Sequence, residues 1–204
     1  MWIAMMGCIS DHFLPPFADS FKERYPEMWG NVRVPFDAYY NSEIGLLARA
    51  ISFGLKDSTS HVVYLQNFMV ECSGPNSMKT ELDSHSSFAR KYKEVIVKCN
   101  DLLKQARRHA GAKLLFFQYS GALSISSDLA NQLSYLYPKL RIAVAYVHGA
   151  LANLSLRGKN IRDISEKIIP LFEGARGGGH PEAVGLRLKS EDLGRFKEML
   201  NGSL

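Results

Sequence analysis

The sequence contains little cysteine and no long hydrophobic run, and both absences narrow the class of protein. Its three cysteines are Cys8, Cys72 and Cys99, and no two of them form a CxxC pair. This spacing argues against a disulfide framework and against a structural zinc site. Charged residues such as Glu43 and Arg49 interrupt the most apolar stretches, so none reaches the roughly 18–20 residues that cross a bilayer. We therefore expect no membrane partner and a location in the reducing cytoplasm.

The composition is that of a folded protein with an uneven charge distribution. Hydrophobic residues make up 46% and charged residues 22% of the 204-residue chain, which leaves room for one substantial domain or two small ones. Residues 1–79 have a net charge of −2, residues 80–140 of +4 and residues 141–204 of +3. Because clustered Lys and Arg attract phosphate groups, this gradient favours an anionic partner such as a nucleotide or nucleic acid.

The first 79 residues show mainly helical patterns. The apolar segment 1–7 predicts the last turns of a helix, with Gly7 as a left-handed cap. Ser42 is placed to cap a helix that starts at Glu43. Residues 58–69 favour another helix, although Val62 and Val63 leave a strand open. The Gly-Pro-Asn-Ser cluster at 74–77 is a strong chain breaker and predicts a domain boundary near residue 79.

The remaining residues predict one long helix followed by a compact α/β domain. Thr80 to Asp83 resembles a capping box, and it opens a basic amphipathic stretch that runs to Ala110. Its Lys and Arg residues fit a solvated face or a nucleic-acid contact. From residue 111 the hydrophobic period alternates, which predicts the order βα-ββ-α-loop-βα. The pair His148-Gly149 indicates a hairpin between the second and third strands.

A glycine-rich segment at 174–185 holds the most specific pattern in the chain. Gly177, Gly178 and Gly179 are consecutive and are followed by His180. Glycine is entropically unfavourable in a folded segment, so such a run indicates unusual backbone angles or close approach to another group. Successive backbone N–H groups in a loop can form a nest for a phosphate oxygen, to which His180 adds a donor. A flexible loop with a surface histidine remains the alternative.

This segment resembles the GGGH loop of the DHHA1 domain, the C-terminal half of the DHH phosphoesterases that include RecJ-like exonucleases and oligoribonucleases. Residues 154–157 resemble the strand of that family that ends in an arginine, and residues 126–130 resemble the start of its first helix, so the resemblance covers 111–204. It implies substrate-phosphate contacts for Gly177, Gly178, Gly179, His180 and Arg157. Arg157 is also suited to a structural ion pair with a carboxylate.

A second resemblance concerns metal binding. Residues 7–11 resemble the fourth motif of the DHH catalytic domain, which implies that Asp11 is a carboxylate ligand of a divalent ion, manganese by family analogy. The Asp-His-His triplet and the other early motifs have no counterpart in this chain. A catalytic metal pair needs several carboxylate and imidazole ligands, so Asp11 alone does not suffice. We therefore assign no catalytic residue and expect no hydrolysis by this chain alone.

These observations predict an α/β protein in three parts. Residues 1–79 would be a mostly helical remnant of a DHH catalytic domain, residues 80–110 a bridging helix, and residues 111–204 a complete, mixed-sheet DHHA1 domain. The expected function is the binding of single-stranded nucleic acid, an oligonucleotide or a nucleotide, as the C-terminal part of a manganese-dependent phosphoesterase. The alternatives are a non-catalytic adaptor that pairs with a separate catalytic chain or forms a homodimer, and, less favoured, an enzyme with a site of its own.

Overall fold

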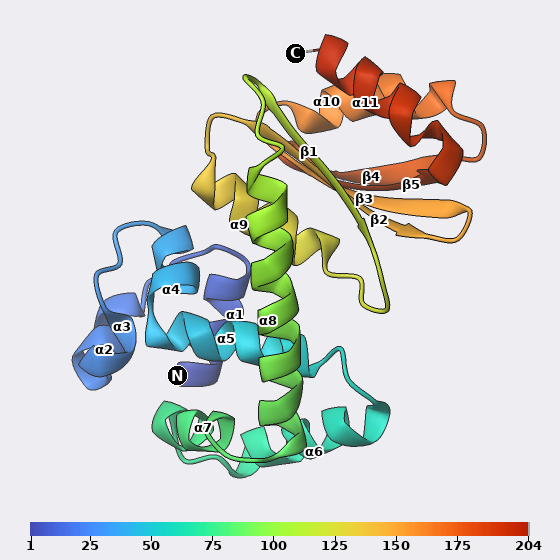
Figure 1. Ribbon diagram of the computed structural model, residues 1–204. Coiled ribbons are helices and arrows are strands. Elements are labelled where there is room, and N and C mark those ends of the chain that lie inside the picture. Colours follow the sequence, from blue (N-terminus) through green and yellow to red (C-terminus); the bar gives the residue numbers. More distant parts are fainter. Residues whose placement is uncertain (204) are drawn as a thin grey trace. The chain divides into compact units, whose positions relative to one another are not determined.

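The computed structural model describes residues 1–203 and separates into two compact units. Unit 1 comprises Met1–Val97, and unit 2 begins at Lys98, so the division falls within one long helix. Each unit has its own cluster of buried apolar side chains. Every regular element described in unit 1 is a helix, whereas unit 2 is built around a five-stranded sheet (Figure 1). Within residues 1–203, no helix combines the length and the apolar character needed to span a bilayer.

Unit 1 packs its helices around α5. Ser42 begins this helix as expected, because its Oγ accepts a hydrogen bond from the backbone N–H of Gly45 at 3.0 Å. The buried face of α5 includes Ile44, Leu47 and Phe53, and it packs against α1, α3, α4, α6 and α7. The helices of this unit are α1 (Trp2–Ser10), α2 (Ala18–Arg24), α3 (Pro26–Trp29), α4 (Pro35–Asn41), α5 (Glu43–Gly54), α6 (Thr59–Glu71), α7 (Pro75–Leu82) and the first part of α8 (Ser87–Arg107).

Three expectations for unit 1 change in the structure. Gly7 does not cap α1, which continues to Ser10, and the left-handed residue after it is His12 at φ 54°. The segment with Val62 and Val63 is helical, so the strand alternative was wrong. The long helix α8 begins at Ser87 and not at Thr80, which belongs to α7. Pro75 starts α7, in the first-turn position that suits proline. At the start of α8, Ser86 Oγ accepts a hydrogen bond from the Ala89 N–H at 3.2 Å.

Unit 2 has the predicted order of elements around a mixed sheet, except that the predicted glycine-rich loop contains an additional strand. Its strands lie in the order β1-β2-β3-β5-β4; β1 and β2 are parallel and the other neighbours are antiparallel. The predicted hairpin at His148-Gly149 is confirmed, with Gly149 at φ 58° between β2 and β3. The elements are β1 (Leu114–Ser120), α9 (Ser126–Leu136), β2 (Arg141–His148), β3 (Leu151–Arg157), α10 (Ile161–Ile168), β4 (Arg176–His180), β5 (Ala183–Lys189) and α11 (Leu193–Gly202).

The two faces of this sheet differ in chemistry. Helices α10 and α11 lie together on one face (Figure 1) and bury the alternate residues Val184, Leu186 and Leu188 of β5. Helix α9 packs against β2 and β3 on the opposite face. That face is apolar where α9 covers it. Beyond β3 it carries small and basic residues, because the alternate residues of β5 that point there are Ala183, Gly185, Arg187 and Lys189. The sheet therefore presents an uncovered polar area beside the first turn of α9.

Two tyrosines fix the segment that leads into α9. The Tyr119 hydroxyl accepts a hydrogen bond from the buried Ile125 N–H at 2.7 Å, at the N-cap of the helix. The Tyr146 hydroxyl donates to the Gly121 carbonyl, also at 2.7 Å. Burial raises the pKa of Tyr119, against the opposing effect of the bond from Ile125, so this hydroxyl stays neutral at physiological pH. The start of α9 is thus held in a defined position against the sheet.

Candidate functional site

The polar area of unit 2 consists of three rows that cross β3, β5 and β4. Residues that pair directly in an antiparallel sheet point to the same face, so each row follows from the register. The first row contains an arginine and a histidine at its two ends, the middle row contains only small side chains, and the third row contains two arginines. We call this area the polar sheet face; its rows are Arg157-Ala183-His180, Ser155-Gly185-Gly178 and Asn153-Arg187-Arg176.

The glycine run is an edge strand and not the loop that the sequence predicted. Gly177 and Gly179 allow β4 to pair with β5, because a Cβ at Gly177 would lie 2.5 Å from the Leu186 Cβ and one at Gly179 would overlap the Ala183 carbonyl oxygen. Close approach of two backbones therefore explains these two glycines. It also removes the loop nest as the basis of a site, since Arg176 to His180 is paired with β5 throughout.

Packing within the protein does not explain the glycines of the middle row. A Cβ at Gly178 or at Gly185 would have no heavy atom within 4 Å. Both residues are exposed and lie opposite each other in the register. Glycine in a strand interior is destabilising by roughly 0.5–1 kcal/mol relative to alanine. Two such glycines side by side indicate a place where another group approaches the backbone closely.

Arg157 is fixed at the end of β3 by the first turns of α9. Its Nε donates to Asn131 Oδ1 at 2.6 Å and its Nη2 donates to Ser127 Oγ at 3.0 Å. In the next row, the Ser155 and Ser126 hydroxyls lie 3.1 Å apart. The three hydrogen bonds described for the guanidinium, including one to the Leu156 carbonyl, go to uncharged oxygen atoms. These three bonds fix the orientation of the side chain.

Some of the predicted binding residues lie together on the polar sheet face, and residues that were not predicted lie beside them. Arg157, Gly178 and His180 lie on the polar sheet face, whereas Gly177 and Gly179 point to the opposite face and act through the backbone of β4. Asn153, Ser155, Arg176 and Arg187 were missed. Arg187 could have been found from the alternation in β5: with Leu186 and Leu188 in the core, Arg187 must point to the other face of the sheet. Arg176 could not have been found in this way, because its place beside Arg187 depends on the register between β4 and β5, which the sequence does not reveal.

Asp11 does not lie in a metal-binding arrangement. It is exposed and occupies the C-cap of α1, where its backbone N–H is bonded to the Cys8 and Gly7 carbonyls. Across residues 1–203, no group of three or more His, Cys, Asp or Glu side chains is positioned to hold a metal ion. The residues present thus do not fit the manganese centre that the resemblance implied, and we assign no catalytic step to such an ion here.

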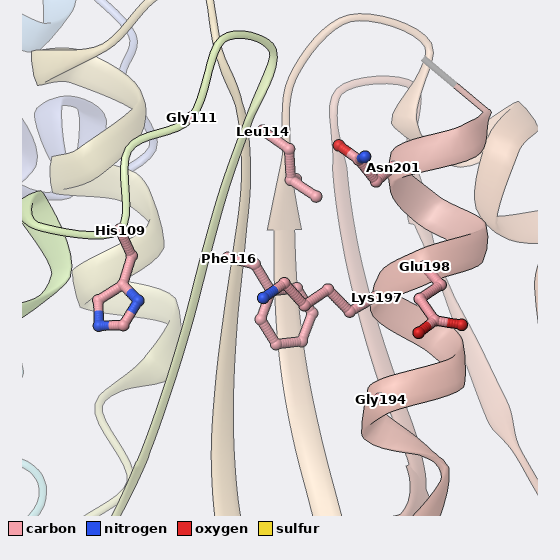
Figure 2. Close-up of a pocket in the computed structure, with 8 residues that line it drawn as sticks. All are labelled: His109, Gly111, Leu114, Phe116, Gly194, Lys197, Glu198 and Asn201. Atoms are coloured by element: carbon pink, nitrogen blue, oxygen red, sulfur yellow. The ribbon is translucent and has the colours of Figure 1, made fainter.

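Two hollows lie among the residues described for unit 2, and one of them is on the polar sheet face. A shallow cavity of about 460 Å³ is lined by Ser126, Asn153, Ser155, Arg176 and Arg187 together with Gly177, Gly185, Leu154 and Leu186. A second, of about 520 Å³, lies between β1 and α11. Figure 2 shows Lys197, Glu198 and Asn201 of this second cavity on α11, and His109 on the far side of β1.

Two polar side chains of the second cavity contact aromatic rings of β1. Lys197 Nζ lies over the Phe116 ring, 5.6 Å from its centroid, and so is engaged within the protein (Figure 2). The His109 ring packs near Phe117 at a centroid separation of 5.7 Å. The polar sheet face, with its unexplained glycines, is therefore the stronger candidate site.

Comparisons with known proteins were informative at the level of structure. No protein-family model and no curated protein sequence matches the chain. The solved structure of Thermus thermophilus RecJ in complex with Mg²⁺ is similar with a TM-score of 0.58 at 13% identity, over 97% of this chain and 29% of that one. The DHH domain of a member of a ribosomal-protein family is similar with a TM-score of 0.60 at 13% identity, over 99% of this chain and 49% of that one.

A third similar structure is the pGpG-specific phosphodiesterase PggH of Vibrio cholerae, with a TM-score of 0.51 at 15% identity, over 98% of this chain and 65% of that one. The chain thus spans between 29% and 65% of the length of these three proteins. At such identities the likeness concerns the fold. The chain has a DHH/DHHA1-like fold that extends over most of its length.

Proposed function

We propose that unit 2 binds single-stranded nucleic acid or an oligonucleotide through its phosphate groups, on the polar sheet face. The observation that supports this most strongly is the middle row, where Gly178 and Gly185 leave open space that no packing within the protein requires. Cationic side chains lie on both sides of that space. A phosphodiester backbone suits such a surface, because it is narrow, negatively charged and able to approach the strand backbone closely.

In this proposal Arg157 and His180 contact one phosphate from opposite ends of the first row. A guanidinium presents planar, permanently charged donors that match phosphate oxygens, and Ser127 and Asn131 hold it in place. His180 supplies a ring N–H donor from the edge strand. The fold similarity to RecJ and to a pGpG-specific phosphodiesterase supports an oligonucleotide as the ligand. We further propose that the chain binds this ligand without hydrolysing it, since no group of three or more metal-ligating side chains is found among residues 1–203.

The test measures oligonucleotide affinity by fluorescence anisotropy for the wild-type chain and for Arg157→Ala and His180→Ala. Each replacement removes a donor to phosphate, so affinity is expected to fall about 10- to 100-fold for Arg157→Ala and about fivefold for His180→Ala. Binding of the wild-type chain is expected to weaken as salt rises. With manganese present, we expect the oligonucleotide to remain intact.

Arg195→Ala is the matched control. Arg195 belongs to α11 on the opposite face of the sheet, where its guanidinium lies over the Phe172 ring. Its replacement changes the net charge as much as Arg157→Ala does, and we expect nearly wild-type affinity. If Arg157→Ala and Arg195→Ala lose the same amount of affinity, net charge alone explains the effect, which would contradict a defined site. Robust manganese-dependent hydrolysis by the chain alone would contradict the non-catalytic part of the proposal.

A further inference from the structure

Two arginines face each other in the third row of the polar sheet face. Arg176 of β4 and Arg187 of β5 are directly opposite in the register, and both are exposed. Like charges at directly opposed positions of neighbouring strands repel each other. Within residues 1–203, neither guanidinium has a carboxylate within ion-pair distance. This is an unfavourable arrangement for the free protein, and an anion between the two side chains would relieve it.

Two other basic residues of unit 2, by contrast, form ion pairs with acidic side chains. Lys189, the next residue of β5 on the same face, pairs with Glu173 at 2.8 Å. This contact raises the pKa of Lys189 and lowers that of Glu173. Arg162 of α10 likewise pairs with Glu166 at 2.7 Å. Acidic side chains thus neutralise Lys189 and Arg162, whereas the two opposed arginines have no ion pair among residues 1–203.

The arginine pair borders a hollow of suitable shape. Arg176, Arg187 and Asn153 line the cavity of about 460 Å³, and its floor continues through Ser155 and Gly185. Asn153 pairs with Arg187 across the sheet and adds an amide to the same row. The third row thus combines two guanidinium groups with the amide of Asn153, which can both donate and accept a hydrogen bond. The small residues of the middle row separate it from the first row.

The distance between the two cationic rows determines the size of the ligand. Ala183 of the first row and Arg187 of the third are four residues apart on β5, which corresponds to roughly 13 Å along the strand. One phosphate group is too small to contact Arg157 in the first row and Arg187 in the third. A ligand with phosphates at intervals along a flexible backbone can contact both and cross the glycines between them.

We propose that Arg176 and Arg187 form a second phosphate subsite, and that the ligand of the polar sheet face is a single-stranded oligonucleotide that spans both cationic rows. This rests on the function proposed above and makes it more specific, because it excludes a mononucleotide as the full ligand. Of the nine positions, only His180 carries a ring, so the face offers little on which bases can stack. Recognition is therefore directed at the backbone and tolerates any base sequence.

The experiment compares two probes, a nucleoside 5′-monophosphate and a hexanucleotide, on the full chain. The variant is Arg176→Gln/Arg187→Gln, and the matched control is Arg195→Gln/Lys197→Gln, which removes two positive charges from α11. We expect the hexanucleotide affinity of the variant to fall about 10- to 100-fold. The slope of log affinity against log salt should fall by about 0.7, because the contact with one phosphate of the single strand is lost. Monophosphate affinity should not change, and the control should resemble the wild type.

Thermal unfolding without ligand serves as a check on folding. Removal of two opposed positive charges is expected to leave the Tm of the variant equal to or above that of the wild type. If hexanucleotide affinity and salt slope are unchanged in this variant while Arg157→Ala still weakens binding, the second subsite is wrong and the proposed function stands. If the wild-type chain binds neither probe, the proposed function itself is wrong. Equally tight, Arg176- and Arg187-dependent binding of a poly-glutamate peptide would overturn the assignment to phosphate.

Discussion

Replacement of Gly179 by alanine is expected to lower the free energy of unfolding of unit 2 by about 2–3 kcal/mol, an effect typical of overpacking. The added Cβ would overlap the Ala183 carbonyl oxygen and lie 3.0 Å from the Val184 Cα. Both are backbone atoms of the paired strand, so a change of side-chain rotamer cannot relieve the overlap. Strands β4 and β5 would have to separate, and β4 has no other neighbour in the sheet.

The appropriate measurement is hydrogen exchange of backbone amides in peptides that span β3, β4 and β5, at several urea concentrations. A single global transition is not assumed, because the chain has two units. Gly178→Ala is the control: it lies one residue away in the same strand, but its Cβ would enter open space. We expect its stability to change by no more than about 0.5–1 kcal/mol, and in the stabilising direction. Equal destabilisation by the two replacements would contradict the distinction between the glycines.

Replacement of Gly178 by valine is expected to weaken oligonucleotide binding strongly and to change the stability of unit 2 little. Valine favours strands, and the side chain would project from the polar sheet face into open space. That space is the path by which we propose that the phosphate backbone approaches β4 and β5. Loss of the contacts around it should reduce oligonucleotide affinity about 30- to 100-fold.

Fluorescence anisotropy measures this loss, and thermal unfolding shows that the variant is folded. Gly194→Val is the matched control, because Gly194 also has open space around it but lies on α11, on the opposite face of the sheet. Its affinity for the oligonucleotide is expected to equal that of the wild type. Wild-type affinity in Gly178→Val would mean that the open middle row is not used by the ligand.

Local sequence patterns predicted the elements whose causes are local. Ser42 begins α5 through its own hydroxyl, and Gly149 forms the hairpin turn through a positive φ, so both follow from a few neighbouring residues. The start of α8 was misplaced, because Thr80 to Asp83 looks like a capping box although it ends α7. Gly7 looked like a cap but lies within α1. Local patterns show which residues can begin or end a helix, and tertiary packing decides which of them do.

The candidate site was predictable only in part, for a related reason. The glycine run and His180 are visible in the sequence, and the resemblance identified Arg157. The edge strand formed by Arg176 to His180 was missed, because glycine is normally depleted in strands. Here Gly177 and Gly179 fit because β5 lies too close for a side chain. Since the register pairs Arg176 with Arg187, the third row became apparent only in three dimensions.

An NMR titration of the isotope-labelled chain with a single-stranded oligonucleotide would show directly which surface binds the ligand. We predict that the largest backbone amide shifts fall on the polar sheet face, at Ser155, Gly178, Gly185 and Arg187, and that residues of α10 and α11 shift little. A titration in which the largest shifts lie instead around Asn201 and Lys197 of the second cavity, or within unit 1, would contradict the assignment of the ligand to this face.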